Sequence, residues 1–498
     1  MKLIYDVDGK PKAGQLVLFA LQQLLAIMAA TIVVPVIVNG AAGSTVLSQD
    51  AALVGAGFGT LTYLLFTKFK SPVFLGSSFA FISPLIAAVA FGYFGVLIGA
   101  AFAMAVYVVI AVAVKFAGTK WVDKLMPPVV IGPTVALIGL SLASSAMSDL
   151  TKASGATTWQ SYNLVAILCG LFTFFVIVFC SVKGNKTMKL IPFIIGILCG
   201  YALAGIFSIF GYSLNVDYLK IINFQPLIEN FSPVTFQSFL DYPKLTFLKT
   251  AGEGISKLTG AGVANIALLY IPVAFVVFAE HIADHKNISS IIERDLLKDP
   301  GLHRTLLGDG VGSFVGSIFG GIPNTTYGES IGCVAITKNA SIRTIFVCAL
   351  MCIVLAFIRP VMCFLATIPN CVMGGVCLSL YGFIAVSGLN MIKNVDLNKS
   401  KNLFVVSSIL IAGIGGLALK FGADGTGEGA VITISSIATA LIIGIVVNAC
   451  FKEKSEVAEG DSLPSASVVE KGVIDEPTTD APVEEKAEEA DVENKDAE

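Results

Sequence analysis

The chain has 498 residues, of which 55% are hydrophobic and 13% are charged, and its mean hydropathy is +0.83. Soluble domains carry about 25% charged residues, so this composition excludes a soluble globular protein. The formal net charge of −3 conceals an uneven distribution, because the segment Glu453–Glu498 contains 16 acidic and 4 basic residues. We therefore expect residues 452–498 to form a disordered acidic tail.

Apolar runs long enough to span a membrane, about 20 residues each, recur along the chain as far as residue 451. They predict an all-α polytopic membrane protein with 14 transmembrane segments, seven on each side of a polar stretch at 212–260. After a polar N-terminus at 1–12, the spans are expected at 14–38, 50–67, 73–91, 94–116, 127–147, 161–182, 189–211, 262–283, 304–320, 323–337, 341–366, 371–390, 402–419 and 430–451.

The distribution of basic residues gives this arrangement an orientation. The loops after the even-numbered spans contain 17 Lys and Arg residues, and the opposite loops contain 7. Cytoplasmic loops are the ones enriched in Lys and Arg, so we expect both termini to be cytoplasmic and the loop at 212–260 to be extracytoplasmic. Because each half has an odd number of spans, the two halves must face opposite ways.

The tenth span carries a carboxylate, Glu329, in a run of small and hydroxyl residues. Pro323 and the surrounding glycines disfavour a continuous helix, since Gly costs about 1 kcal/mol and Pro about 3 kcal/mol in a helix interior. Residues 324–327 suit a short extended segment, with helix beginning near Glu329. Broken backbone at membrane depth is tolerated where it is buried or lines a cavity, so this segment is a candidate functional site.

Two motifs of the first half recur faintly in the second. Residues Gly76–Phe81 resemble Asn324–Glu329, and Pro127–Gly132 resembles Pro369–Gly374, in the same order and at comparable spacing. This pattern predicts an inverted repeat with paired broken segments. In transporters built this way, the substrate site lies near the bilayer midplane between the repeats.

The eighth span supplies further polar candidates. Glu280 follows eight apolar residues, and Asp284 lies four positions later on the same helical face. Glu280 is either a second site carboxylate or a polar residue that marks the helix end. Asp284 and His285 are interpreted as interface or loop residues, and His303 as a surface residue.

Two carboxylates in a partly dry site can accept hydrogen bonds from adjacent N–H groups of a flat ligand. Burial also favours protonation of a carboxylate, which would permit coupling to a proton gradient. Phe79 and the matching Tyr327 offer faces for stacking on a planar ring, or else pack in the core. The sequence has no phosphate-binding loop, no nucleophile elbow and no cysteine–histidine spacing of a zinc site. We expect a transporter without cofactor or metal, not an enzyme.

At this point a family resemblance can be stated. The run Glu329–Lys338 resembles the signature of the nucleobase/ascorbate transporter family (nucleobase-cation symporter type 2). The segments Leu75–Pro84, Ala279–His281, Asp299–Arg304 and Pro323–Glu329 are similar to those of its bacterial uracil-transporting members. The similarity extends in order over residues 11–451 and does not include the acidic tail.

The resemblance implies a transporter domain at 13–451, with short antiparallel strands in the third and tenth segments. Its core domain would contain spans 1–4 and 8–11 (about 13–118 and 261–367). Its gate domain would contain spans 5–7 and 12–14 (about 126–211 and 370–451). The family further implies a homodimer in the cell membrane (inner or plasma membrane) that performs uracil:proton symport as the core rocks against the gate.

The resemblance also assigns roles by position. Glu280 and Glu329 would bind the pyrimidine, Phe79 would stack on it with Tyr327 nearby, and the backbone of Gly328 and Ala30 would line the site. Candidates for proton coupling are Glu280, Asp284 and Glu329.

The chain departs from the family pattern at two positions. Gln23 stands where the family has a histidine in the first span, and Ser330 stands where its signature has asparagine. The first change leaves open how a carboxylate is oriented, and the second is expected to loosen the local hydrogen bonds.

Alternative functions remain. The nearest alternative is a permease of the same architecture for xanthine or another purine, although Glu at 329 favours uracil. An anion transporter is disfavoured by the two carboxylates. A ligand sensor or membrane-embedded enzyme has no supporting motif, and no feature indicates nucleic-acid binding.

Overall fold

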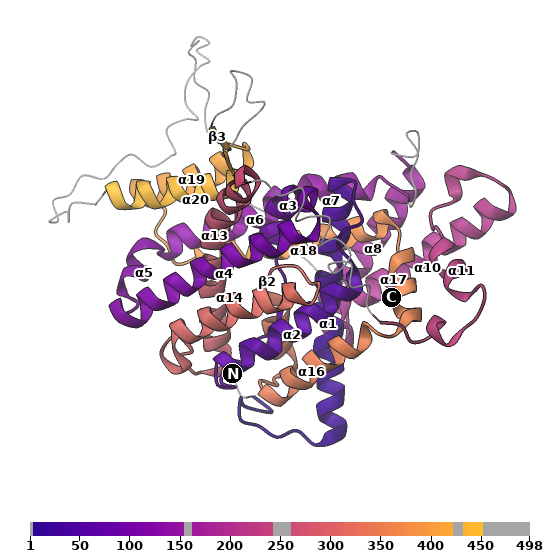
Figure 1. Ribbon diagram of the computed structural model, residues 1–498, viewed down its shortest axis with the longest axis horizontal. Helices are drawn as coiled ribbons and strands as arrows, with labels where there is room; N and C mark the ends of the chain where they lie inside the picture. Colours follow the sequence, from indigo (N-terminus) through magenta and orange to yellow (C-terminus); the bar gives the residue numbers. More distant parts are fainter. Residues whose placement is uncertain (1–2, 154–161, 243–259, 422–431, 452–498) are drawn as a thin grey trace, which may run out of the picture. The chain divides into compact units, whose positions relative to one another are not determined.

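The computed structural model describes residues 3–153, 162–242, 260–421 and 432–451. All of them lie in one unit, Met1–Lys452, so the predicted acidic tail at 452–498 falls outside the described residues. The described chain is mostly helical, as the apolar runs predict (Figure 1).

The first half of the chain provides the helices and the first strand up to residue 213. They are α1 (Ala13–Ala42), α2 (Gln49–Phe66), β1 (Leu75–Ser77), η1 (Phe79–Phe81), α3 (Ile82–Ala88), η2 (Val89–Phe91), α4 (Gly92–Ala117), α5 (Lys120–Leu125), α6 (Pro128–Ser141), α7 (Ala143–Leu150), α8 (Leu164–Lys183), α9 (Lys186–Leu190) and α10 (Pro192–Ser213).

The second half begins with short helices in the polar stretch and then repeats the pattern of long helices. Its elements are η4 (Asp217–Leu219), α11 (Gln225–Phe231), η5 (Phe236–Ser238), α13 (Gly260–Ile292), η6 (Leu297–Gly301), α14 (Leu302–Ile318), β2 (Asn324–Thr326), α15 (Gly328–Thr337), α16 (Ile342–Leu355), α17 (Arg359–Thr367), α18 (Asn370–Met391), α19 (Ser400–Ile414), β3 (Leu419–Phe421), β4 (Ile432–Ile434) and α20 (Ser436–Cys450).

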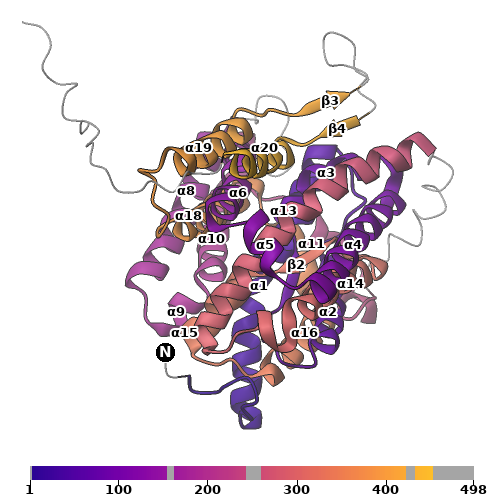
Figure 2. The ribbon, with the colours of Figure 1, turned by 90° about the vertical axis from the view of Figure 1, so that its left-hand side faces the viewer.

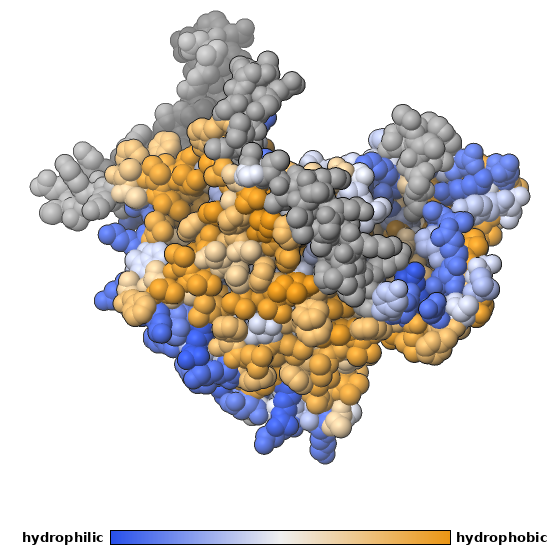
Figure 3. Space-filling model, viewed as in Figure 1, coloured by the Kyte–Doolittle hydropathy of each residue, from blue (hydrophilic) through white to orange (hydrophobic). Residues whose placement is uncertain are grey.

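The surface and the helix lengths fit a membrane environment. Seven helical stretches among the described residues are long and apolar enough to cross a bilayer. Large apolar side chains such as Phe116, Leu164 and Ile411 are exposed on the helices, and Figure 3 shows a broad hydrophobic area across one face. Because exposed apolar patches of this extent are rare on soluble monomers, the protein is a multi-pass membrane protein.

The long helices pack in two groups. In one group α14 packs on α2 and α4, α16 packs on α1 and α2, and α13 packs on α4. In the other, α18 packs on α6 and α8, α19 packs on α20 and α6, and α10 packs on α8. Figure 2 draws α19, α18 and α8 on the opposite side from α4, α14 and α2. Contacts between the groups are fewer and include α13 with α6 and α15 with α9.

The third and tenth predicted segments are broken, and the two breaks pair with each other. Leu75, Gly76 and Ser77 lie opposite Thr326, Thr325 and Asn324 in an antiparallel pair. The backbone bonds continue beyond the strands, from Tyr327 N to Phe74 O at 3.1 Å and from Ser78 N to Pro323 O at 3.1 Å. The expected antiparallel strands are therefore present.

Gly76 makes this pairing possible. A Cβ atom at this position would lie 2.3 Å from the ring of Tyr327. The ring lies across the strand because the Tyr327 hydroxyl donates to the carbonyl oxygen of Ser77 at 2.9 Å. The aromatic ring of the tenth predicted segment thus covers the glycine of the third.

The structure corrects three predicted boundaries. Helix α13 continues to Ile292 instead of ending near 283, because Ile288 and Ile292 are buried and extend its apolar contacts. Strands β3 and β4, which pair antiparallel, lie in the chain between α19 and α20. Consequently the helix predicted at 402–419 ends at Ile414, and the helix predicted from 430 begins at Ser436. Isoleucine, leucine and phenylalanine suit strands as well as apolar helices, so the apolar runs alone did not distinguish them.

Candidate functional site

A cavity of about 400 Å³ lies beside the strand pair, where helices of the two groups meet. Helices α13 and α15 contribute to one side, and α6 and α18 contribute to the other. Six of the residues proposed from the sequence line it: Phe79, Glu280, Asp284, Tyr327, Gly328 and Glu329.

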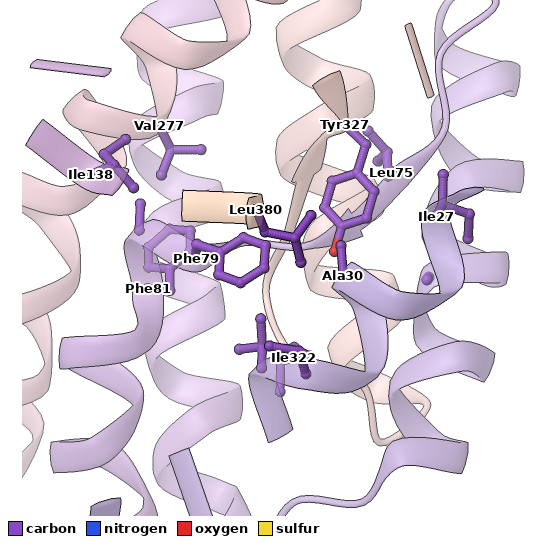
Figure 4. Packing of buried hydrophobic residues seen from close by; sticks show 14 of the residues in the cluster. Ile27, Ala30, Leu75, Phe79, Phe81, Ile138, Val277, Ile322, Tyr327 and Leu380 are labelled. Atoms are coloured by element: carbon purple, nitrogen blue, oxygen red, sulfur yellow. The ribbon is translucent and has the colours of Figure 1, made fainter. Parts of the chain in front are cut away.

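Ala30 does not line the cavity. It is fully buried in α1, and Figure 4 shows it beside the ring of Tyr327. The residue of α1 that reaches the cavity is Ala26, four positions and about one helical turn earlier. Helix α1 therefore contacts the cavity, one turn before the predicted Ala30.

The two glutamates approach the cavity from different elements. Glu280 lies inside α13, with twelve further helical residues after it, so the interpretation that it marks a helix end is wrong. Glu329 is in the first turn of α15, where the helix dipole stabilises a negative charge. Among the described residues neither carboxylate forms an ion pair, which leaves both able to contact a ligand.

The start of α15 also offers hydrogen-bond donors. The first N–H groups of a helix have no partner within the helix, and the first bond that closes this helix runs from Ile331 N to Tyr327 O at 3.2 Å. Gly328 is exposed to the cavity. Carboxylate acceptors and backbone donors therefore face the same space, as recognition of a flat ring with both N–H and C=O groups requires.

Asp284 is part of this wall instead of a loop. It lies one turn after Glu280 in α13 and lines the cavity. Its Oδ2 accepts a hydrogen bond from Thr326 Oγ1 at 2.7 Å. This bond fixes strand β2 to the helix that carries Glu280, so Asp284 has a positioning contact in addition to its exposure to the cavity.

The two histidines of α13 are buried and hydrogen-bonded. His281 Nδ1 lies 2.7 Å from Asp309 Oδ2, and its Nε2 lies 3.0 Å from Thr305 Oγ1. His285 Nδ1 lies 2.8 Å from the His281 carbonyl oxygen, and its Nε2 lies 2.7 Å from the Tyr63 hydroxyl oxygen, which donates to Ser71 Oγ at 2.6 Å. His285 is therefore not a loop residue, and it lies where α13 contacts α2. These bonds join α13 to α2 and α14.

Asp309 was missed by the sequence analysis. It is almost fully buried in α14, in a glycine-rich segment that is otherwise typical of close helix packing. The signal was present, since a carboxylate inside an apolar span is a functional candidate by default. Its contact with His281 holds the residue next to Glu280.

The two departures from the family pattern contact each other. The Gln23 side-chain amide donates to Ser330 Oγ, and also to the Ser330 carbonyl oxygen at 3.3 Å. Ser330 Oγ in turn accepts from Phe74 N at 3.1 Å. Ser330, the residue after Glu329, therefore joins α1 to the start of the strand pair.

Aromatic residues close the cavity between the two helix groups. Phe79 lines it and makes an edge-to-face contact with Tyr381 of α18, with 5.6 Å between the ring centroids. Figure 4 shows Leu380 between Phe79 and Tyr327. Tyr327 both packs on Gly76 and contributes to the cavity wall. Among the described residues, no cluster of three or more His, Cys, Asp or Glu side chains is placed to hold a metal ion.

Comparison with known proteins settles the family. Residues 14–421 match the model described as "Permease family". The chain belongs to this permease family. The match confirms the resemblance to nucleobase/ascorbate transporters, and it confirms that the protein is a membrane transporter instead of an enzyme.

Curated relatives match along nearly their whole length. A uracil permease of Bacillus subtilis (strain 168) is 36% identical over 462 residues, which cover 91% of this chain and 97% of the relative. A uracil permease of Bacillus caldolyticus is 35% identical over 92% of this chain and 97% of the relative. A uracil permease of Escherichia coli (strain K12) is 35% identical over 90% of this chain and 93% of the relative.

Solved structures share the fold at low identity. The anion transporter SLC26A9 matches with a TM-score of 0.53 at 12% identity, covering 88% of this chain and 66% of that one. The transmembrane domain of the cyanobacterial bicarbonate transporter BicA matches with a TM-score of 0.50 at 14% identity. The match covers 88% of this chain and 98% of that one. Such likeness shows the fold of a membrane transporter and leaves the cargo to the residues of the site.

Proposed function

We propose that the protein is a uracil permease of the cell membrane that carries uracil together with protons. The observation that carries this proposal is a cavity lined by Glu280 and Glu329 in a chain similar to uracil permeases over about nine-tenths of its length. Its volume of about 400 Å³ lies within the range of about 300–1,000 Å³ that is usual for small-molecule sites.

Uracil is a flat ring with two N–H donors and two carbonyl acceptors. In the proposed complex Glu280 and Glu329 accept from its N–H groups, and the backbone at Gly328 donates to a carbonyl oxygen. Phe79 stacks on the ring, with Tyr327 beside it and the helix of Ala30 behind. The two carboxylates disfavour an anionic cargo, because like charges would repel at short range.

The architecture that we propose has fourteen spans in a seven-plus-seven inverted repeat. The antiparallel pairing of the two broken segments supports the repeat, and so does the proline that precedes both α6 and α18. The two groups of packed helices support a core at about 13–118 and 261–367 and a gate at about 126–211 and 370–451. Both termini would then be cytoplasmic and the loop at 212–260 extracytoplasmic.

Alternating access is the proposed mechanism, and two cavities along α1 support it. The smaller cavity reaches Ala26, whereas a second cavity of about 910 Å³ reaches Pro35, Val36 and Asn39. The intervening residues, 27–34, are buried and line neither cavity. Rocking of the core against the gate would open this barrier on one side and close the other.

Proton coupling would use a carboxylate of the cavity. The candidates are Glu280, Asp284 and Glu329. A bound proton would neutralise a carboxylate that otherwise stays charged in a dry site within the bilayer. We also propose that the protein forms a homodimer, as the family resemblance implies.

Uptake of labelled uracil into uptake-deficient cells that express the chain tests the proposal. We expect unlabelled uracil to reduce uptake of the labelled uracil, and xanthine to leave it unchanged. Glu329→Gln should abolish uptake, since an amide accepts one hydrogen bond less and cannot carry the proton, and a protonophore should collapse accumulation. Strong competition by xanthine would indicate the purine alternative, and absence of uracil uptake in protein that reaches the membrane would contradict the proposal.

A further inference from the structure

The N-terminal segment before α1 pairs with the loop that follows α15. Tyr5 and Asn339 form a parallel β-bridge. Ile4 N donates to Lys338 O at 2.7 Å, Ala340 N donates to Tyr5 O at 2.8 Å, and Ile342 N donates to Val7 O at 3.0 Å. In Figure 2 the start of the described chain lies beside α15. Residues 3–9 are therefore an ordered strap and not a free polar end.

Side chains of the strap hold it to the helices underneath. Val7 is fully buried in the main hydrophobic cluster. The Tyr5 hydroxyl donates to Gln15 Oε1 at 2.7 Å, and its ring contacts Phe19 edge to face, so α1 is included. Ser341 Oγ donates to the carbonyl oxygen of Gly9 at 2.7 Å.

A basic residue just after α13 completes the attachment. Arg294 lies two residues after the end of α13. Its Nη1 is 3.0 Å from Asp8 Oδ2, and its Nη2 contacts Asp6 Oδ2. The strap is thus bonded both to the segment that ends α15 and to the segment that ends α13.

These two helices are the ones that carry Glu280 and Glu329. Along the helix axis, Glu329 lies about 13 Å from Lys338 and Glu280 lies about 18 Å from Ile292, at a rise of about 1.5 Å per residue. The strand pair fixes the near end of α15, and the strap ties its far end to α13. A flat ligand held by two carboxylates from different helices needs both at a set separation, since displacements of about 1 Å impair such sites.

We propose that residues 3–9 are a clasp that sets the spacing of the two substrate carboxylates, with Asp6, Asp8 and Arg294 as positioning residues. This inference rests on the proposed function, in which Glu280 and Glu329 bind the substrate. The clasp contacts α1, the start of α16, the segment between α15 and α16 and the segment after α13, so it stays closed while the two helix groups move.

The test measures uracil binding to purified full-length protein, together with its thermal unfolding. Asp6→Asn/Asp8→Asn and Arg294→Gln each remove the ion pairs at exposed positions, and Arg294→Lys keeps a charge. We expect the dissociation constant for uracil to rise about two- to fivefold in the first two variants, which is the range of exposed ion pairs, and to recover in Arg294→Lys. Combining the first two variants should add nothing further, because both remove the same contacts.

The matched control is Lys70→Gln, which removes an exposed ion pair at 2.7 Å from Asp299 away from the strap. It should leave uracil binding unchanged, and its unfolding temperature should fall as much as in the clasp variants. Unchanged binding in the clasp variants, or an equal loss in the control, would overturn the clasp. If Arg294→Gln does not fold, the aspartate variant decides. Wild-type protein that binds no uracil would instead contradict the proposed function.

Discussion

Gln23 and Ser330 show how one pair of residues can orient a site carboxylate. Both side chains are buried, and their hydrogen bond lies next to Glu329 in the chain. Leaving a buried polar group without its partner costs about 1–3 kcal/mol. The orientation of the first turn of α15 is therefore expected to depend on both residues together.

A double-mutant cycle with the residues that the family pattern has at these positions tests this dependence. Gln23→His and Ser330→Asn should each weaken uracil binding by about tenfold, equivalent to about 1.4 kcal/mol, because each leaves a mismatched partner. The double variant should recover most of the loss, since contacting residues couple by about 0.5–3 kcal/mol. Isothermal titration with uracil measures all four proteins, and purely additive losses would contradict the coupling.

At the residue scale, the sequence identified the carboxylates but not their supports. Glu280 and Glu329 were selected because charges inside apolar spans are few, whereas Asp284 was interpreted as an interface or loop residue and named only as a candidate for proton coupling. All three line one cavity. Asp309 and Tyr63 support α13 through His281 and His285. Those bonds connect residues far apart in the chain, and no spacing rule shows that such residues meet. The same limit explains why Gln23 and Ser330 were seen as separate departures.

At the scale of elements, the breaks in the third and tenth segments were predictable from local chemistry. Glycine and proline disfavour helix in the tenth segment, the third segment resembles it, and the structure has strands in both. The antiparallel pair of β3 and β4 was not predicted, because apolar runs of a few residues suit strand or helix equally. The long end of α13 was missed since its polar residues resemble a loop, while tertiary contacts of Ile288 and Ile292 maintain the helix.

Gly76→Ala tests the strand pair directly. Its Cβ would lie 2.3 Å from the Tyr327 ring, so the ring must move and the pairing must distort. Overpacking of this kind costs about 1–3 kcal/mol, and we expect uracil uptake to fall at least tenfold.

The control is Gly382→Ala in α18, where an added Cβ has no atom within 4 Å. Alanine favours helix over glycine by about 0.5–1 kcal/mol, so this variant should keep wild-type uptake and stability. Uptake assays at matched membrane expression compare the two variants. Equal uptake in both would show that the contact between Gly76 and Tyr327 is dispensable.

At the scale of the whole molecule, transport requires the two helix groups to move past each other while each stays packed. Within each group the helices share extended contacts, and the contacts between groups are few. One of these is a small apolar cluster, separate from the main core, in which Ile191 between α9 and α10 packs against Ala26 and Cys333. Helices α1 and α15 thus meet the other group at this cluster, close to the cavity that Ala26 and Cys333 also line.

Linking this contact covalently tests the rigid-body motion. Ile191→Cys places a second thiol against the native Cys333, and oxidation or a short dimaleimide should join the two groups. We expect the rate of uracil transport to fall below about one-tenth of the rate without the link, because the link prevents the two helix groups from moving past each other. Reduction of the disulfide should restore transport. Uracil binding should persist, since neither glutamate is altered.

The same oxidation applied to Ile191→Cys/Cys333→Ser controls for the remaining cysteines and should leave transport intact. Undiminished transport by fully linked protein would mean that α15 and the turn before α10 move as one body, and that the core and gate must be divided elsewhere.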